Sequence, residues 1–295
     1  QYLLFKTMWN TIAEQISHAT ERSFQVKHRR SVGGGSINQA YAITDETGQR
    51  SYFVKLNQAS QVAMFEAEAL GLKQIFATQT IRVPQPICWG TVDRSAFIVM
   101  EWLDLGYGDH QAWEAMGRNL AAMHRLTSEQ GFGWQQNNTI GSTPQINTWT
   151  ETWVEFFVEH RLGYQFHLAR QRGGRFPQQE QILAAVPKLL AGHTPIPSLV
   201  HGDLWTGNAA VTQQGDPVIL DPAVYFGDRE VDLAMSQLFG SFPPNFYSAY
   251  NEAFPLPPGY QRRKILYNLY HILNHFNLFG GGYESQANQM IASLL

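Results

Sequence analysis

The chain has 295 residues, enough for two domains of about 150 residues each. Hydrophobic residues make up 44 % and charged residues 15 %, so most of the chain is expected to fold around a core, which excludes disorder over most of its length. With 21 Lys and Arg against 24 Asp and Glu, the net charge is −3, which lacks the basic surplus that nucleic-acid binders use to neutralise phosphates.

The expected cellular compartment follows from three features that the sequence does not show: a pair of cysteines, a signal peptide and a membrane span. The single cysteine, Cys88, cannot form an intrachain disulfide, and we expect it to be a small buried side chain. The first apolar run is shorter than the ~7–15 residues of a signal peptide, and none approaches the ~18 of a membrane span. Residues 1–7 precede Met8 and are either an upstream extension or foreign to the natural chain. We expect a soluble cytoplasmic protein with no membrane or nucleic-acid partner.

The first hundred residues are expected to form a small antiparallel sheet with helices. Apolar side chains alternate with period two between residues 24 and 56, as in strands, and Asp45–Gly48 is typical of a hairpin turn. Ser60 is the expected N-cap of a following helix. The expected elements are a helix at 10–21, strands at 24–28, 41–43 and 52–56, a helix at 60–77, and strands at 87–89 and 96–100.

Beyond Leu105 the pattern becomes mainly helical, with apolar residues recurring every three or four positions. The expected helices are 111–126, 148–171, 178–190, 229–239, 260–276 and 284–295, interrupted by loops at Gly173–Gly174, 194–198 and Pro243–Pro244. This order predicts an α+β fold with an N-terminal lobe at 1–100, a hinge at 101–105 and a C-terminal lobe at 106–295.

The strongest motif is His201-Gly-Asp-Leu-Trp-Thr-Gly-Asn208, which matches the kinase catalytic-loop pattern H-R-D-L-x-x-x-N at four positions, with Gly202 in place of arginine. At ~5 % per residue type, four fixed positions match by chance only about 2 × 10⁻³ times in such a chain. Asp221 follows 13 residues after Asn208, at the end of a short apolar strand. Because phosphoryl transfer needs a positioned nucleophile and neutralised charge, we expect Asp203 to accept the acceptor hydroxyl's proton. Asn208 and Asp221 supply the oxygen ligands that Mg²⁺ requires.

The first half of the chain supplies matching nucleotide-binding parts. Lys55 lies on a strand 22 residues after Gly33, where V-A-I-K strands place the lysine that binds phosphates. Glu66 and Glu68, on the next helix, are both candidate partners of Lys55, and Glu68 is preferred because 13 residues leave more chain for the strand exit. A glycine-rich loop between two expected strands offers backbone N–H groups to a phosphate, although alone it is also typical of a flexible hairpin. That loop is formed by Gly33, Gly34, Gly35 and Ser36.

An apolar strand leads into the proposed hinge. There the backbone carbonyl of Glu101 and the N–H of Leu103 are expected to bind the adenine edge, with Met100 lining the pocket behind it. The glycine loop, the lysine, the glutamate helix, the hinge and the catalytic loop with its metal aspartate occur in kinase order. This order favours a nucleotide-dependent phosphotransferase.

These motifs together resemble the fructosamine kinase (ketosamine-3-kinase) family, a branch of the aminoglycoside-phosphotransferase and protein-kinase-like fold. The resemblance covers essentially the whole chain after Met8, and the tryptophan of the catalytic loop and the D-P-A-x-Y-x-G-x-R-E-x-D-L-A-M run are its specific features. The segments that carry it are 33–38, 53–55, 64–72, 201–208, 221–235 and 269–280.

The resemblance implies a two-lobed protein-kinase-like fold and ATP-dependent phosphorylation of the 3-hydroxyl of a ketosamine, the Amadori product of a sugar and an amine. The acceptor is implied to be a small molecule or a glycated protein. Such 3-phosphates tend to fall apart and free the amine, so the implied role is deglycation. By position, Asp203 matches the family's catalytic base, Asn208 and Asp221 its magnesium ligands, and Lys55 and Glu68 its nucleotide-orienting pair.

Other residues that match the family pattern are expected to bind the acceptor or to hold the catalytic loop in place. Trp205 and His275 match positions that line the sugar pocket in family members, which fits because an indole face stacks on a sugar and an imidazole bonds its hydroxyls. Arg229, Glu230 and Asp232 follow the metal aspartate, and we expect them to brace the catalytic loop, with contact to the acceptor as the alternative.

One position departs from the family pattern. Some members carry a cysteine in the glycine-rich loop for redox-sensitive interchain bridging, whereas this chain has Ser36, so that switch is expected to be absent. The dimerisation that the bridge supports is then in doubt, and we expect a monomer or a weak homodimer.

Two other functions compete with this interpretation. A kinase for an aminoglycoside, choline or similar acceptor is the alternative, but an aminoglycoside pocket should be strongly acidic. Residues 260–295 carry Arg262, Arg263 and Lys264 with only Glu284. A nucleotide-binding pseudokinase is less favoured, because a pure binding module does not need the base Asp203.

Overall fold

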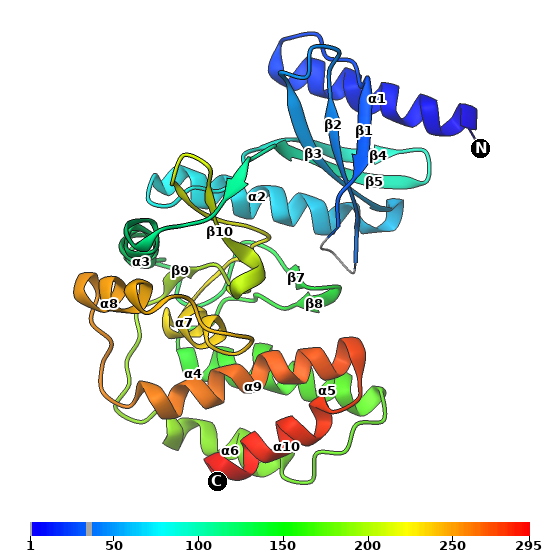
Figure 1. Ribbon diagram of the computed structural model, residues 1–295. Coiled ribbons are helices and arrows are strands. Elements are labelled where there is room, and N and C mark those ends of the chain that lie inside the picture. The colour runs from blue at the N-terminus through cyan, green and yellow to red at the C-terminus, as the bar shows by residue number, and fades with distance from the viewer. Residues whose placement is uncertain (1, 34–36) are drawn as a thin grey trace. The chain divides into compact units, whose positions relative to one another are not determined.

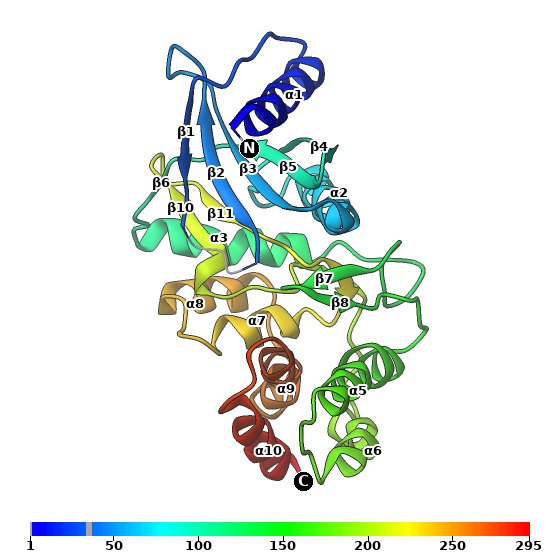
Figure 2. The ribbon, with the colours of Figure 1, turned by 90° about the vertical axis from the view of Figure 1, so that its right-hand side faces the viewer.

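The computed structural model describes residues 2–33 and 37–295, with the backbone alone described for residues 2–6. It divides the chain into two compact units, Gln1–Ala77 with Arg82–Leu105 and Thr78–Ile81 with Gly106–Leu295. We call these the N-terminal unit and the C-terminal unit and describe each by itself; Figure 1 and Figure 2 show their elements.

The N-terminal unit holds a five-stranded antiparallel sheet in the order β1-β2-β3-β5-β4. Its elements are α1 (Tyr2–Thr20), β1 (His28–Ser31), β2 (Gln39–Thr44), β3 (Ser51–Gln58), the 3₁₀ turn η1 (Ala59–Gln61), α2 (Val62–Thr78), β4 (Pro86–Val92) and β5 (Ser95–Glu101). The predicted turn joins β2 to β3: Asp45 donates its N–H to the Arg50 carbonyl at 3.1 Å, and Gly48 adopts φ +71°.

Strand alternation in β3 separates a core face from a functional face. Ile12 and Ile16 of α1 pack in one hydrophobic cluster with Val54 and Leu56 of β3. Because successive side chains of a strand point to opposite faces, Lys55 points away from this cluster. On that other face it meets α2.

The C-terminal unit is mainly helical with short strands. Small antiparallel pairs form from β10 with β11, β9 with β12 and β7 with β8. Its elements are β6 (Leu105–Gly106), α3 (His110–His124), β7 (Asn138–Ile140), β8 (Thr143–Gln145), α4 (Trp153–Phe156), the π-helix η2 (Phe157–Gly163), α5 (Tyr164–Gln171), α6 (Gln179–Leu189), β9 (Ser198–Val200), the 3₁₀ turn η3 (Thr206–Asn208), β10 (Ala209–Thr212), β11 (Pro217–Ile219), β12 (Tyr225–Gly227), α7 (Glu230–Ser236), α8 (Pro244–Ala253), α9 (Tyr260–Phe279) and α10 (Tyr283–Leu294). Mixed helices and antiparallel sheet confirm the predicted α+β class.

Several predicted boundaries are wrong for identifiable reasons. The first helix begins at Tyr2 rather than near residue 10, and the first strand begins only at His28. Ser60 lies inside η1 and does not cap α2, because a 3₁₀ turn precedes the helix. The helix expected from residue 148 begins at Trp153, where the Thr152 side chain caps it.

The loop predicted at Pro243–Pro244 is in fact the start of α8. Proline is tolerated at the first helical position, where its missing N–H has no intrahelical partner to lose. This helix packs tightly on α3: a Cβ on Gly117 would lie 2.4 Å from the Phe246 carbonyl oxygen. Glycine at this crossing lets the two backbones approach.

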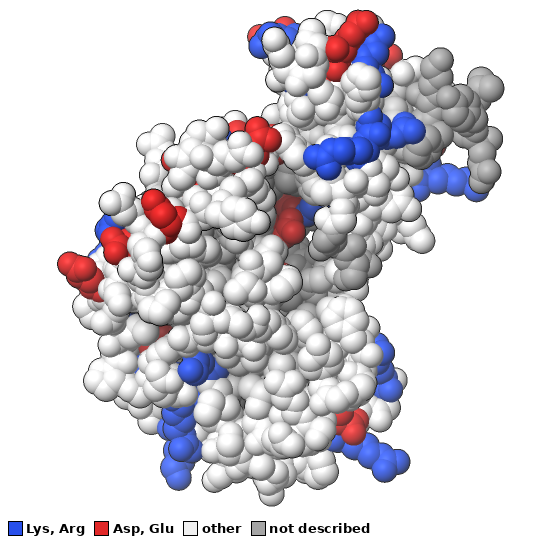
Figure 3. Space-filling view, in the orientation of Figure 1, with Lys and Arg blue, Asp and Glu red and all other residues white. Residues whose placement is uncertain are grey.

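Charge is sparse on the surface, as the composition predicts. On the face drawn in Figure 3, scattered Lys, Arg, Asp and Glu side chains stand on a mostly uncharged surface, and groups of opposite sign adjoin in several places. Among the described residues, the helices are all too short or too polar to cross a bilayer.

Candidate active site

The predicted catalytic loop lies between β9 and β10 in the C-terminal unit. His201 follows β9 directly and is completely buried. Its Nε2 pairs with the Leu220 carbonyl at 2.6 Å, and its Nδ1 pairs with the Asp203 N–H at 3.1 Å. Burial lowers the pKa of His201, which favours the neutral ring. A neutral ring that donates from Nε2 and accepts at Nδ1 satisfies both bonds, so His201 fixes the start of the loop.

Gly202 stands where the kinase pattern has arginine, and the backbone explains the substitution. Its φ is +85°, in the region that favours glycine. A Cβ at this position would lie 2.1 Å from the Ala223 carbonyl oxygen. The loop therefore admits no side chain here.

Asp203 and Asn208 are in direct contact. The Asn208 amide nitrogen donates to the Asp203 carbonyl at 2.8 Å and to its carboxylate Oδ2 at 3.3 Å. Asp203 is half-buried, and burial together with the charge of Asp221 raises its pKa well above the usual value, against the opposing effect of the Asn208 hydrogen bond. A cation beside these groups would offset that repulsion.

Asp221 completes the cluster from the next strand. It follows Leu220, whose N–H donates to the Asn208 carbonyl at 2.9 Å. Asp221 is exposed and adopts φ +50°, a strained conformation for a residue that is not glycine and one that concentrates at functional sites. The Asp221 carboxylate and the Asn208 amide oxygen are hard oxygen donors, the kind of ligand that Mg²⁺ takes.

Asp232 of α7 holds the backbone of the catalytic loop. Its Oδ1 accepts from the Gly202 N–H at 2.9 Å, and its Oδ2 accepts from the His201 N–H at 2.8 Å. His124, at the end of α3, pairs through Nε2 with the same Oδ2 at 2.8 Å. Burial alone would raise the pKa of Asp232, but the hydrogen bonds from His124 and from the Gly202 N–H outweigh burial and lower the pKa. An ionised Asp232 thus braces the loop, as expected for this segment.

The support continues behind His124. Its Nδ1 pairs with the Tyr250 hydroxyl at 2.7 Å, and Arg229 donates to that hydroxyl at 3.1 Å. Arg229 also donates to the carbonyls of Phe254 at 2.7 Å and Pro255 at 2.5 Å. Arg229 therefore braces α8 rather than an acceptor. The sequence pattern did not single out His124 or Tyr250, because a histidine at a helix end and a tyrosine on a helix carry no motif of their own.

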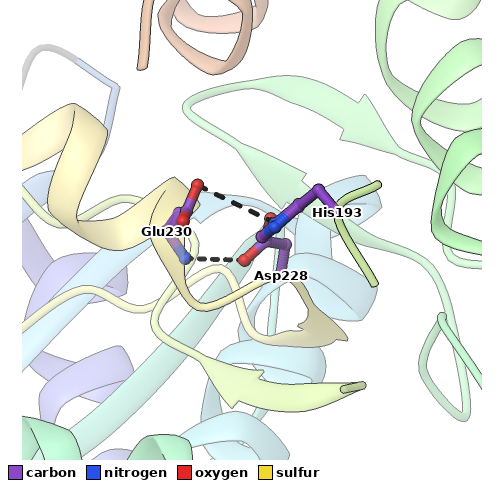
Figure 4. A group of neighbouring side chains, drawn as sticks. All are labelled: His193, Asp228 and Glu230. Carbon is purple, nitrogen blue, oxygen red and sulfur yellow. Dashed lines mark hydrogen bonds and ion pairs between the residues drawn. The ribbon is translucent and has the colours of Figure 1, made fainter. Parts of the chain in front are cut away.

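A second buried cluster, shown in Figure 4, lies where the chain enters α7. His193 pairs with Asp228 at 2.6 Å, and Tyr267 donates to the same Asp228 oxygen at 2.5 Å. Arg263 binds both oxygens of Glu230, at 2.7 and 2.8 Å. Burial raises the pKa of Glu230, although the Arg263 bonds oppose it. His193, Asp228 and Glu230 are close enough to hold a metal, but their oxygens are already bonded, so the cluster serves as a brace.

Lys55 of β3 pairs with Glu68 of α2 at 2.6 Å, and both side chains are nearly buried. Glu66, the other candidate partner, is exposed on the same helix. Lys55 pairs with Glu68 because its side chain lies on the face of β3 that α2 covers. This ion pair belongs to the N-terminal unit, whereas Asp203, Asn208 and Asp221 belong to the C-terminal unit.

The described part of the glycine-rich loop is short. Gly33 is exposed, and a Cβ there would meet no atom within 4 Å. Val32 donates its N–H to the Ala40 carbonyl at 2.9 Å, so β1 and β2 are paired up to the loop. The other loop positions that the sequence predicts lie outside the described residues: Gly34, Gly35 and Ser36.

The predicted hinge begins at the end of β5. Met100 is buried within the strand, and Leu103 lies just beyond it, half-buried. Glu101 ends the strand; its N–H donates to the Gln85 carbonyl at 2.8 Å, and its carboxylate pairs with Arg82 at 3.0 Å. These bonds fix the strand end from which the adenine contacts are expected to start.

Trp205 and His275, the two predicted sugar-binding residues, are linked by a third ring. Trp205 is 37 % exposed, and its ring centroid lies 6.4 Å from that of Phe239. Phe239 in turn lies 4.6 Å from the ring of His275. Sequence patterns did not single out Phe239, since it follows α7 in a segment without a motif. The ring chain begins two residues from Asp203.

The comparisons with known proteins concern the chain as a whole. A model of the fructosamine kinase family matches residues 8–295. The chain is 58 % identical over 287 residues to a Synechocystis sp. protein named "Probable ketoamine kinase", covering 97 % of each chain. A crystal structure from Haemophilus somnus, named as a fructosamine-3-kinase, superposes with a TM-score of 0.93 at 32 % identity over 99 % of each chain.

More distant structures share the fold alone. The ADP-bound aminoglycoside phosphotransferase APH(2'')-Ib superposes with a TM-score of 0.64 at 12 % identity, over 96 % of this chain and 98 % of that one. The fold is therefore that of the protein-kinase-like phosphotransferases, as the motif order predicts. The family match and the identity to the Synechocystis protein confirm the resemblance found in the sequence. The chain belongs to the fructosamine kinase family.

Proposed function

We propose that this chain is an ATP-dependent kinase that phosphorylates the 3-hydroxyl of ketosamines and so promotes their deglycation. The observation that carries the proposal is the clustering of Asp203 and Asn208, on a loop whose backbone Asp232 holds, with Asp221, which follows β11. Family membership and relatives named ketoamine kinase and fructosamine-3-kinase support the acceptor class.

In this proposal each residue has one task. Asp203 accepts the proton of the 3-hydroxyl as that oxygen attacks the γ-phosphorus. Asn208 and Asp221 would hold Mg²⁺, which would neutralise charge on the nucleotide phosphates. Lys55, oriented by Glu68, binds those phosphates.

The remaining predicted contacts complete the assignment. The glycine-rich loop covers the phosphates with backbone N–H groups, and the hinge backbone at Glu101 and Leu103, with Met100 behind, binds adenine. Trp205 stacks on the sugar and His275 bonds a hydroxyl. The lobes are residues 1–100 and 106–295 with the hinge at 101–105, and the protein acts in the cytoplasm as a monomer or weak homodimer.

The test is a phosphate-transfer assay across fructosamines, ribulosamines and aminoglycosides, with the phosphorylated position identified by NMR. We expect transfer to O3 of the ketosamines. The Asp203→Asn variant should lose turnover by a factor of at least ~10², the scale of a lost general base, while still binding nucleotide.

The matched control is Asp216→Asn, an exposed aspartate in the turn between β10 and β11. It removes the same charge from a nearby turn and should retain wild-type turnover. Transfer to an aminoglycoside but to no ketosamine would contradict the proposed acceptor. Unchanged turnover in Asp203→Asn would remove Asp203 from the role of base.

A further inference from the structure

A row of aromatic rings extends from the catalytic loop across α9 and α10. It starts at Trp205 and Phe239 and continues to His275, whose centroid lies 5.7 Å from that of Phe279 and 5.2 Å from that of Tyr283. Phe279 and Tyr283 also contact each other at 6.5 Å. We call Phe239, His275, Phe279 and Tyr283 the aromatic row. It reaches well beyond the two positions assigned to the sugar.

The aromatic row and the neighbouring Trp205 are partly open to solvent. Phe279 is 55 % exposed and Trp205 is 37 % exposed, while Phe239, His275 and Tyr283 are half-buried. Single exposed apolar side chains are common, but a contiguous exposed group marks a binding surface. A structural role at the junction of α9 and α10 would favour burying Phe279 rather than exposing it.

The electrostatics of the aromatic row suit a cationic ligand. Nδ1 of His275 lies 2.7 Å from the His271 carbonyl, to which it donates, and burial lowers the pKa of His275, so the row carries no positive charge of its own. Burial also lowers the pKa of His271 to about 3. Glu284, next to Tyr283, accepts the Arg175 N–H at 3.1 Å. The negative faces of the rings and the Glu284 carboxylate attract a cation, against the opposing charge of Arg172, whose guanidinium donates to the Asn277 carbonyl at the end of α9.

Resting on the proposed function, we propose that the aromatic row is the subsite for the amine part of the ketosamine, where ring faces bind its secondary ammonium and alkyl chain. In a ketosamine the nitrogen is bonded to C1, two carbons from C3. When Asp203 faces the 3-hydroxyl and Trp205 stacks on the sugar, the amine leaves the sugar close to Trp205. Phe239 is the next ring after Trp205, so its face meets the ammonium. His275 keeps its bond to a sugar hydroxyl, and Phe279 and Tyr283 meet the alkyl chain.

The test compares two ligands of equal shape. One is the fructosamine of a simple alkylamine, and the other is its carbon isostere, in which CH₂ replaces NH₂⁺. Dissociation constants are measured by calorimetry in the presence of Mg-ADP, which permits no phosphate transfer. We expect the wild-type protein to bind the ammonium compound more tightly, by about two- to five-fold for each ring that faces the charge.

Phe239→Leu keeps an apolar side chain but removes the ring that meets the ammonium, and should reduce this preference at least about two-fold. The control is Phe76→Leu, which removes a surface ring from α2 and should leave the preference unchanged. Equal affinity of the wild-type protein for both ligands, or an equal loss for both in Phe239→Leu, overturns the subsite. If the wild-type protein phosphorylates fructosamine, the proposed kinase function stands even when the subsite is overturned. If it does not, both the proposed function and the subsite fail.

Discussion

Gly202 shows at the residue scale why this catalytic loop departs from the pattern of protein kinases. Its N–H donates to Asp232, its φ is positive, and the Ala223 carbonyl occupies the space of a Cβ. Conformation and contact therefore both require glycine. The loop is positioned by its own backbone, held by one buried carboxylate.

We predict that Gly202→Ala destabilises the protein by at least about 2 kcal/mol and strongly lowers turnover. Left-handed φ costs an alanine roughly 1–2 kcal/mol, and the clash with Ala223 adds to that cost. The measurement is chemical denaturation together with the kinase assay. Gly215→Ala is the control, because its φ is +91° but a Cβ there meets no atom within 4 Å. Equal losses in the two variants would show that backbone strain alone matters at Gly202.

The proposed reactive residues could be picked out from the sequence because chemistry fixes both their type and their spacing. Asp203, Asn208 and Asp221 carry a motif, and the structure brings these three together. Supporting residues carry none. His124 is separated from Asp232 by 108 residues, and only the packing of α3 beside the loop makes them partners. Phe239 was missed for the same reason: its role depends on rings from other elements.

At the element scale, α7 and α9 are joined by a buried ion pair. Arg263 of α9 binds both oxygens of Glu230 at the start of α7, the helix that also carries Asp232. Because burial raises the pKa of Glu230 despite these bonds, desolvation cancels much of the pair's attraction. Removing one partner is still costly, since the other charge is then left buried alone.

We predict that Glu230→Gln lowers the free energy of unfolding by about 3 kcal/mol or more, as expected for breaking a buried pair. The control is Glu114→Gln, which breaks the exposed pair between Glu114 and Arg118, 3.8 Å apart, and should cost less than about 0.5 kcal/mol. Urea denaturation measures both. Replacing both partners by methionine should recover most of the loss, and similar losses in the two single variants would contradict the argument.

Element types were more predictable than their boundaries. Long periodic helices such as α3 and α9 begin and end within a few residues of their predicted limits. In contrast, the sequence did not predict α8, because the prolines at its start are also typical of a loop. Its packing on α3 stabilises the helix. Strands of three residues, such as β9 and β12, are too short for a period to be recognised and are defined by their partners.

At the scale of the whole molecule, the proposed nucleotide-binding residues belong to one compact unit and the proposed magnesium ligands to the other. A nucleotide that binds the folded chain and not the unfolded one stabilises it by mass action. We predict that Mg-ADP at about 100 times its dissociation constant raises the melting temperature by about 5–10 °C. Removing Mg²⁺ with a chelator should reduce this shift, because the proposed ligands then face the phosphates without a cation.

Lys55→Met distinguishes nucleotide binding from general stability. This variant leaves Glu68 without its partner at 2.6 Å and should melt lower even without nucleotide, so the quantity to compare is the shift and not the melting temperature itself. The shift should nearly vanish in Lys55→Met and persist in Asp203→Asn, since the proposed base is expected to contact the acceptor rather than the nucleotide. A full shift in Lys55→Met would show that the ion pair of Lys55 and Glu68 has no part in nucleotide binding and only stabilises the fold. Loss of the shift in Asp203→Asn would instead assign that carboxylate to holding the metal and not to receiving a proton.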